Sequence, residues 1–114
     1  MSTHFCRAGI KRIDEGAFVG LLERVGGVQI RNFGKPSDAY FEIAGRILRS
    51  SKSDTFVIGD DWSTDIKGAN NWGARSILVK TGKYREDYEK KETPLLTIDS
   101  LAEMIGKHRT IARA

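Results

Sequence analysis

Apolar residues recur three or four positions apart in four segments of the chain, which is the spacing of one face of an α-helix. Glycines follow the first and third of these segments, where they can adopt the left-handed conformation that ends a helix. Small polar residues precede the later segments and can accept hydrogen bonds from the unpaired N–H groups of a first turn. The predicted helices are residues 15–25, a segment that carries Tyr40 to Leu48, a segment from Ser63 or Thr64 to Gly73, and a segment from Asp99 or Ser100 through Ile105.

Four short segments between these helices have the composition of β-strands. Residues 55–58 and 76–80 are nearly continuous runs of apolar and β-branched residues, which is typical of strands buried on both faces of a parallel sheet. Residues 28–33 alternate weakly between apolar and polar, and residues 95–98 form another short run. Residues 83–94 are charged and lack periodicity, so we expect a loop there.

The alternation of helices with apolar strands predicts an α/β fold, in which helices flank a mostly parallel sheet of three to four strands. In open sheets of this kind, ligands bind beyond the carboxyl ends of the strands. Asp60 and Asp61 follow the strand at 55–58, and Thr81-Gly82 follows the strand at 76–80. We therefore expect a functional site at this edge of the sheet.

The composition is that of a one-domain globular chain and excludes several classes of protein. With 114 residues, 39% hydrophobic and 30% charged, the chain is neither disordered nor fibrous. Its apolar runs are far shorter than the ~18 residues of a membrane span. The single cysteine, Cys6, rules out an internal disulfide framework and a multi-cysteine zinc site. A reducing, cytoplasmic compartment is therefore expected.

The net charge of +4 comes from the two ends of the chain, where basic residues outnumber acidic ones. Recognition of nucleic acid favours a basic stripe with interleaved aromatic residues on one face. No such stripe is evident in the sequence, which therefore does not favour a nucleic acid partner.

Three carboxylates, Asp60, Asp61 and Asp65, lie within six residues at a strand end and the following helix start. Carboxylates held close together repel one another unless a cation or a proton is present. Mg²⁺ prefers oxygen ligands, so the cluster predicts a metal site with Asp60 as its first candidate ligand and Asp65 and Asp61 as further ones. The alternative is that Asp61 is a solvated loop residue and Asp65 a first-turn acid favoured by the helix dipole.

Lys35 lies between Gly34 and Pro36, just before the second predicted helix. Ser37 or Asp38 can cap that helix. An ammonium group beside the free N–H groups of a helix N-terminus is a suitable site for phosphate. A loop lysine is more often simply solvated, and it is the acidic cluster downstream that gives Lys35 a functional interpretation.

These motifs together resemble the C-terminal half of a haloacid dehalogenase (HAD) superfamily phosphatase. The nearest pattern is subfamily IIA, which contains 4-nitrophenylphosphatase-like, phosphoglycolate and nucleotide phosphatases. The resemblance covers about residues 15–105 and rests on Gly34-Lys35-Pro36-Ser37, Val57 to Ile66, Gly68-Ala69, Gly73 and Ile77 to Gly82. It implies a partial HAD-like Rossmannoid fold, with residues 1–33 as the end of the cap and a return strand, residues 34–108 as the C-terminal half of the core domain, and residues 109–114 as a tail.

The resemblance also implies roles for individual residues. The lysine that matches Lys35 neutralises the phosphoryl group and the nucleophile, and Asp60 matches the aspartate that binds Mg²⁺. Asp65 matches a residue that supports the metal site. The family's nucleophile is the first aspartate of an Asp-x-Asp motif, its second aspartate acts as acid and base, and a serine or threonine after another strand holds the phosphate.

No Asp-x-Asp motif occurs in the 114 residues. We therefore expect a piece of a larger phosphatase, whether from truncation, a partial gene model or cleavage. The piece should be inactive alone, bind Mg²⁺ weakly or not at all, and self-associate through an open sheet edge beside residues 55–59. We expect the parent to act on a small phosphorylated substrate and to have no membrane partner. The alternative is a non-catalytic α/β module that binds a partner through that edge or its basic ends.

Overall fold

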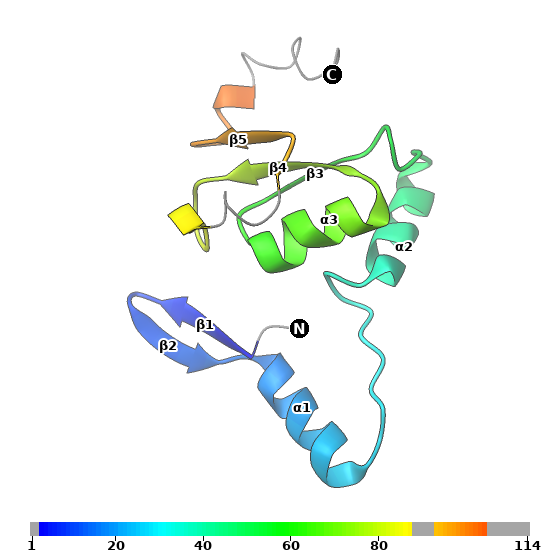
Figure 1. Cartoon of the computed structure of the whole chain (residues 1–114), viewed down its shortest axis with the longest axis vertical. Coiled ribbons are helices and arrows are strands. Elements are labelled where there is room, and N and C mark those ends of the chain that lie inside the picture. The colour runs from blue at the N-terminus through cyan, green and yellow to red at the C-terminus, as the bar shows by residue number, and fades with distance from the viewer. Residues whose placement is uncertain (1–2, 88–92, 105–114) are drawn as a thin grey trace.

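The computed structural model describes residues 3–87 and 93–104 and shows two separate sheets (Figure 1). One is an antiparallel pair, β1-β2, and the other is a parallel sheet with the strand order β3-β4-β5. In chain order the elements are β1 (His4–Arg7), β2 (Ile10–Ile13), α1 (Glu15–Gly26), α2 (Asp38–Leu48), β3 (Phe56–Gly59), the π-helical turn η1 (Trp62–Ile66), α3 (Lys67–Trp72), β4 (Arg75–Val79) and β5 (Leu96–Ile98). The α/β fold class with a parallel three-stranded sheet is confirmed.

The β1-β2 hairpin at the N-terminus was not predicted from the sequence. Its turn consists of Ala8 and Gly9, both with positive φ, between the paired residues Arg7 and Ile10. Two-residue turns with positive φ match the twist of an antiparallel pair, and a glycine in such a turn is the signal that the sequence offered.

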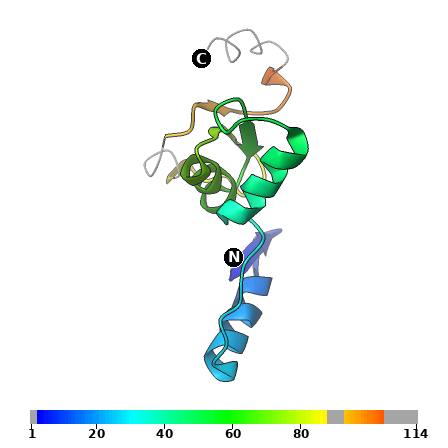
Figure 2. The ribbon, with the colours of Figure 1, turned by 90° about the vertical axis from the view of Figure 1, so that its right-hand side faces the viewer.

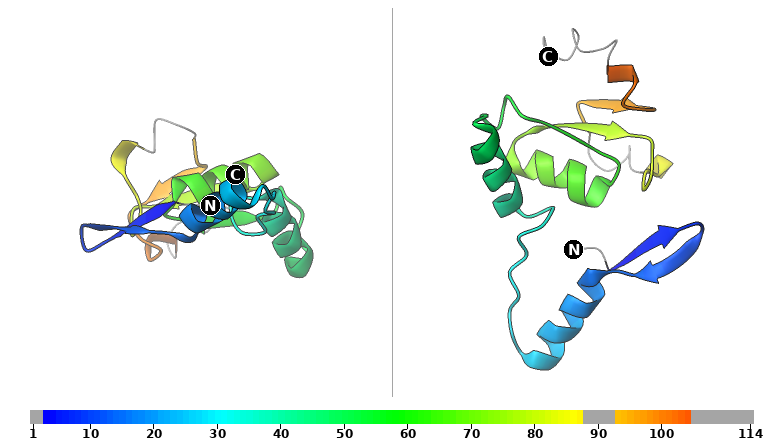
Figure 3. Two further views of the ribbon diagram at one scale, coloured as in Figure 1. Left: turned by 90° about the horizontal axis from the view of Figure 1, so that it is seen from below. Right: turned by 180° about the vertical axis from the view of Figure 1, so that it is seen from behind.

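Helix α1 agrees with the prediction for residues 15–25. Asp14 caps it by accepting a hydrogen bond from the Glu15 N–H, and Gly27 ends it in the left-handed conformation. None of its residues is buried, so its apolar stripe faces solvent in this chain. Figures 2 and 3 show the hairpin and α1 set apart from the parallel sheet, with the segment before α2 as the connection.

The predicted strand at residues 28–33 is wrong, because these residues form no strand and run as irregular backbone between α1 and α2. Side chains take part of the hydrogen bonding that a neighbouring strand would supply. The Ile30 N–H donates to the Glu23 carboxylate at 3.0 Å, and the Gly34 N–H donates to the Asn32 side chain at 2.8 Å. A weak alternation of apolar and polar residues indicates one apolar face, but a strand also needs a neighbouring strand for its backbone hydrogen bonds.

The parallel sheet has its apolar residues on both faces, as predicted for buried strands. On one face η1 and α3 cover β3 and β4, and Phe41 of α2 packs with Ala69 and Trp72 of α3. On the other face Ile77, Val79 and Ile98 form a second cluster, against which Met104 packs. The central strand β4 is therefore the most buried, with Ile77 and Leu78 fully enclosed.

The prediction that the strand at residues 55–58 is buried on both faces is wrong for β3. This strand lies at the edge of the sheet, and Ile58 is 40% exposed. An edge strand has a neighbour on one side only, so its side chains lose the cover that β4 receives from both sides.

The helix after β3 begins earlier than expected. Asp61, rather than Ser63 or Thr64, occupies the cap position, and the first turn is π-helical before α3 continues to Gly73. For the last predicted helix, residues 103 and 104 are helical, and the Glu103 carboxylate accepts hydrogen bonds from the N–H groups of Asp99 and Ser100. The predicted tail at 109–114 and the end of the predicted core at 108 lie outside the described residues.

Within the described ranges, none of the helices combines the length and apolar character that crossing a membrane would require.

Gly68→Ala is expected to lower the free energy of unfolding by about 1–2 kcal/mol through overpacking. A Cβ at Gly68 would lie 2.5 Å from the Phe41 ring and 3.0 Å from the Pro36 Cα, so α3 would have to move away from the segment that carries Lys35. Gly20→Ala in α1, where a Cβ meets nothing, is the matched control and should not destabilise the chain. Urea unfolding followed by tryptophan fluorescence measures both, and equal midpoint shifts would show that the Phe41 contact is not the cause.

Candidate metal and phosphate site

The predicted polar residues gather at the carboxyl ends of β3 and β4. Asp60 and Asp61 follow β3, Asp65 belongs to η1, and the Thr81-Gly82-Lys83 turn follows β4. The parallel pairing of β3 with β4 brings these two turns to the same edge of the sheet. Lys35 reaches this edge from the segment before α2, so the site combines residues far apart in the sequence.

Lys35 and Asp65 form the shortest ion pair of the site. The Lys35 Nζ donates to the Asp65 Oδ1 at 2.6 Å, with the lysine side chain 42% exposed and the aspartate only 8% exposed. The hydrogen bond from this pair raises the pKa of Lys35 above its ordinary value, against the opposing effect of partial burial. Lys35 is thus a charged group whose outer surface remains accessible to an anion.

Gly59 makes room for Asp65 at the end of β3. A Cβ at Gly59 would collide with the Asp65 side chain. The other Asp65 oxygen, Oδ2, accepts a hydrogen bond from the Asp61 N–H at 3.3 Å. Asp65 is therefore enclosed by the strand end and held by Lys35, so both of its oxygens are engaged within the chain.

Asp61 is buried, which excludes the alternative of a solvated loop residue. Its Oδ1 accepts hydrogen bonds from the Ser63 N–H, the Ser63 hydroxyl and the Thr64 N–H, and its Oδ2 lies 3.2 Å from the Lys83 Nζ. Burial alone would raise the pKa of Asp61, but the hydrogen bonds from Ser63 and Lys83 outweigh that effect and hold this pKa below its ordinary value. Asp61 is thus a capping and ion-pairing residue.

Asp60 has the fewest hydrogen-bond partners of the three aspartates at this edge of the sheet. Its Oδ2 accepts a hydrogen bond from the Lys83 N–H at 2.7 Å. Gly82 has a φ of 45°, and a Cβ there would collide with this same oxygen. The turn after β4 therefore fixes the orientation of Asp60, whose Oδ1 accepts no hydrogen bond from the residues that the structure describes.

The three aspartates are not brought together as one cluster. Within residues 3–87 and 93–104, no group of three His, Cys, Asp or Glu side chains is placed to hold a metal ion. Mg²⁺ sites commonly use one or two carboxylates and take their other oxygens from substrate phosphate and water. The donor set fits such a sparse site, with Asp60 as the carboxylate that would hold the ion.

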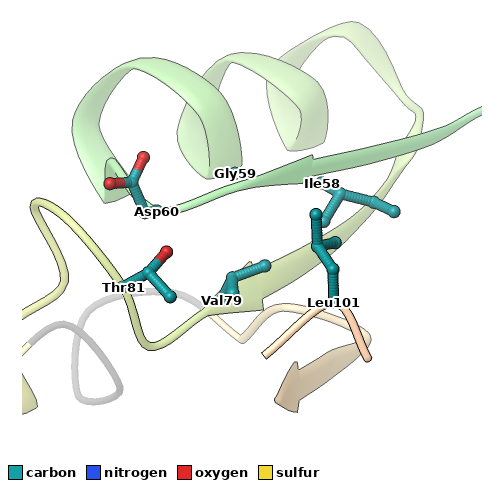
Figure 4. A pocket seen from close by; sticks show the side chains of 6 residues that line it. All are labelled: Ile58, Gly59, Asp60, Val79, Thr81 and Leu101. Atoms are coloured by element: carbon teal, nitrogen blue, oxygen red, sulfur yellow. The ribbon is translucent and has the colours of Figure 1, made fainter. Parts of the chain in front are cut away.

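A pocket of about 420 Å³ lies beside this edge of the sheet (Figure 4). Asp60 and Thr81 are at its polar end, and its apolar side is formed by Ile58, Val79 and Leu101. The pocket places the Asp60 carboxylate next to a space in which a ligand can lie.

Sequence reasoning placed Lys83 in the loop at residues 83–94 and did not single it out. The available signal was its position directly after Thr81-Gly82, at the end of the strand that neighbours β3. Ser37, expected as a cap, does occupy the cap position of α2, but its side chain makes no capping hydrogen bond.

Known proteins share this arrangement of elements and motifs. A family model described as HAD-hydrolase-like matches residues 32–104, which is more than half of the chain. Over 87 residues the chain is 42% identical to haloacid dehalogenase-like hydrolase domain-containing protein 2 of Bos taurus, covering 75% of this chain and 34% of that protein. It is 38% identical over 88 residues to the phospholysine phosphohistidine inorganic pyrophosphate phosphatase of Xenopus laevis, covering 77% and 32% of the two chains.

Solved structures agree with these matches. The p-nitrophenyl phosphatase of Archaeoglobus fulgidus superimposes with a TM-score of 0.80 at 26% identity, covering 92% of this chain and 43% of that one. NagD of E. coli K-12 gives a TM-score of 0.75 at 27% identity, covering 90% and 40%. The chain spans about a third of the length of the curated relatives that it matches. On its motifs, its sheet and these matches, the chain belongs to the HAD-like hydrolase family, and its resemblance to the subfamily IIA phosphatases is confirmed.

Proposed function

We propose that this chain supplies the Mg²⁺-binding and phosphate-binding half of a HAD-type phosphohydrolase. The observation that carries the proposal is the meeting of Lys35, Asp65 and Asp60 at one edge of the parallel sheet. Residues 1–33 would correspond to the end of a cap and residues 34–108 to half of the core domain. The full-length parent would hydrolyse a small phosphomonoester through an aspartyl-phosphate, in the cytoplasm.

Lys35 would bind and neutralise the phosphoryl group. Its ammonium is held by the Asp65 carboxylate at 2.6 Å, yet 42% of the side chain stays exposed, so it can face an anion without moving. A charged group that is already in position needs no reorganisation energy when charge develops on the phosphate oxygens. Asp65 is then a residue that positions Lys35, in addition to any support that it gives to a metal.

Asp60 would hold the Mg²⁺ ion, and the Lys83 N–H would keep its carboxylate in place. When bound, the ion would neutralise charge on the phosphate oxygens. The remaining oxygen ligands would have to come from a phosphate, from water and from a protein segment outside these residues. Binding to this chain alone should therefore be weak, in about the millimolar range or weaker.

The 114 residues lack the nucleophile motif that the resemblance implies for the covalent step. The resemblance to HAD-type phosphatases implies that phosphoryl transfer requires an Asp-x-Asp motif, and the sequence contains none. Lys35 and Asp60 would supply charge neutralisation and orientation, but those need a positioned nucleophile to produce turnover.

The names of the relatives support a small phosphorylated substrate. One is a phospholysine, phosphohistidine and inorganic pyrophosphate phosphatase, one is a 5'-nucleotidase of Bacillus subtilis, and one is a p-nitrophenyl phosphatase. We propose for the parent the same broad class, a small molecule with a transferable phosphoryl group.

A second candidate function is a binding module, favoured by the edge position of β3. In the described structure β3 pairs only with β4, and Ile58 is 40% exposed. An apolar edge strand with unpaired backbone groups is a template for another strand. Self-association of the isolated chain through this edge is part of the proposal.

The purified 114-residue chain is expected to show Mg²⁺-dependent phosphate binding without turnover. Hydrolysis of 4-nitrophenyl phosphate should stay at background, whereas Mg²⁺ with inorganic phosphate should shift the NMR amide signals of residues 59–65. Asp60→Asn should remove the Mg²⁺ shift. Asp54→Asn, just before β3 at the opposite end of the strand, is the matched control and should leave it unchanged.

Two results would contradict this prediction. One is turnover that survives repurification and disappears in Asp60→Asn, because the chain would then hold its own nucleophile. The other is an equal response of the Asp60→Asn and Asp54→Asn variants to Mg²⁺, because Asp60 would then not be a ligand.

A further inference from the structure

The turn after β4 makes two separate contacts with the turn after β3, and both come from Lys83. Its backbone N–H donates to the Asp60 Oδ2 at 2.7 Å, and its side-chain Nζ lies 3.2 Å from the Asp61 Oδ2. Lys83 thus joins two consecutive carboxylates that are 22 and 23 positions earlier in the chain.

We infer that Lys83 is a positioning residue that holds Asp60 and Asp61 in their working orientation. The inference rests on the proposed function, in which Asp60 is a metal ligand, and extends it to the residue that aligns this ligand. Residues that hydrogen-bond to a metal-binding carboxylate orient it, and their mutation typically weakens metal binding by about 10- to 100-fold.

The backbone around Lys83 is built to keep its N–H on Asp60. The Thr81 N–H donates to the Val79 carbonyl at 2.8 Å, and the Tyr84 N–H donates to the Thr81 carbonyl at 2.8 Å, so the turn is closed on both sides of Gly82. Gly82 has positive φ and no Cβ, which allows the Asp60 carboxylate to approach the turn. The turn is therefore shaped around this carboxylate.

The side chain of Lys83 acts on the neighbouring aspartate. The Asp61 Oδ1 already accepts three hydrogen bonds from Ser63 and Thr64, which leaves Oδ2 for Lys83. The Asp61 side chain is 9% exposed and that of Lys83 is 47% exposed, so the pair lies at the rim of the site. The contact therefore fixes the orientation of the Asp61 carboxylate at the edge of the site.

A positioning role and a simple charge effect predict opposite results. Lys83→Met removes a positive charge beside two carboxylates, which by charge alone would strengthen Mg²⁺ binding. Lys83→Met keeps the backbone N–H on Asp60 but releases the neighbouring Asp61 carboxylate. If the Lys83 side chain positions Asp61 and with it the turn that carries Asp60, the variant should weaken Mg²⁺ binding, by about tenfold as for other groups that orient metal ligands. The sign of the change therefore separates the two explanations.

The test compares Lys83→Met with Lys83→Arg and Lys80→Met in the full 114-residue chain. Lys80 is the control, because its side chain is similarly exposed, at 40%, and forms an ion pair with the exposed Asp99. Mg²⁺ is titrated while NMR follows the amide signals of Asp60 and Asp61. We expect weaker binding in Lys83→Met, near wild-type binding in Lys83→Arg, and no weakening in Lys80→Met. Tighter or unchanged binding in Lys83→Met would overturn the inference.

Amide hydrogen exchange without metal gives a second readout, which is independent of the proposed function. Gly82→Ala should displace Asp60 and speed exchange of the Lys83 N–H. Gly9→Ala, which also has positive φ but meets nothing with its Cβ, is its control and should not change that rate. Lys83→Met should speed exchange of the Ser63 and Thr64 N–H groups that Asp61 binds. Unchanged exchange in both site variants would overturn the inference, whereas faster exchange in a chain that ignores Mg²⁺ would uphold it and count against the metal function alone.

Discussion

Lys35→Met is expected to lower the free energy of unfolding by about 2–3 kcal/mol. The substitution leaves the Asp65 carboxylate, 8% exposed, without its ammonium partner and with only the Asp61 N–H at 3.3 Å. Removal of one partner of a fully buried pair has a larger effect, and the 42% exposure of Lys35 places this pair below that limit. Chemical denaturation of the variant and of the parent chain measures the difference.

Lys80→Met is the matched control for this prediction, because Lys80 has the same degree of exposure but pairs with Asp99, whose side chain is 80% exposed. Its loss should change stability by less than about 1 kcal/mol. Asp65→Asn in the Lys35→Met background should recover part of the loss, since the buried group is then neutral. Equal effects of Lys35→Met and Lys80→Met would show that the Asp65 pair contributes no more than a surface pair.

The same pair sets a pH dependence at the alkaline end. The pKa of Lys35 is raised in the folded chain by its hydrogen bond to Asp65. Its contribution to stability is therefore complete below the ordinary lysine pKa of about 10.4 and is lost as the pH rises through the higher folded-state value. The stability difference between the parent chain and Lys35→Met should accordingly shrink at pH values above about 10.4.

Phe41→Ala is expected to cost about 3–5 kcal/mol, the largest effect that we anticipate for a single substitution. Phe41 is 3% exposed, and its ring stacks on Trp72 with centroids 6.1 Å apart. Small domains have about 5–15 kcal/mol of stability in total, so the variant should lose most of its cooperative unfolding. Because Phe41 anchors α2 to α3, the segment with Lys35 should also lose its position.

Phe18→Ala provides the control for Phe41→Ala with the same chemical change. Phe18 lies on α1 and is 59% exposed, so its removal should alter stability by less than about 1 kcal/mol. Circular dichroism melts of the two variants give the comparison. A destabilisation by Phe18→Ala as large as that by Phe41→Ala would mean that the exposed stripe of α1 is covered, for instance by a second copy of the chain.

The local pattern of apolar and polar residues was sufficient to predict most of the helices and strands of the α/β part of the chain. The helix at residues 15–25, the three-turn helix that carries Phe41 and the buried strand around Ile77 follow from the spacing and continuity of apolar residues. The same patterns explain the α/β fold class and the edge at which Asp60 and Thr81 lie. These features depend on neighbours within a few residues, which the sequence displays directly.

The tertiary structure decided which elements find partners. Residues 28–33 have a strand-like pattern and no strand beside them, whereas the edge position of β3 agrees with the open edge expected beside residues 55–59. Backbone hydrogen bonds of a strand belong to the pair of strands, so the pattern of one segment cannot supply them.

Long-range contacts also determined the different partners of the three aspartates. The sequence ranked Asp60 as the first candidate ligand, with Asp65 and Asp61 as further ones, but it could not show which partner each carboxylate has. In the fold, Lys35 reaches Asp65 from 30 positions away, and Lys83 reaches Asp61 and Asp60 from 22 and 23 positions away. The sequence by itself determined the elements, the edge of the sheet and the residue types gathered there. Only the folded chain determined which carboxylate pairs with Lys35, which one caps a helix and which one is held by the turn after β4. The first and third of these depend on the meeting of residues that are distant in sequence.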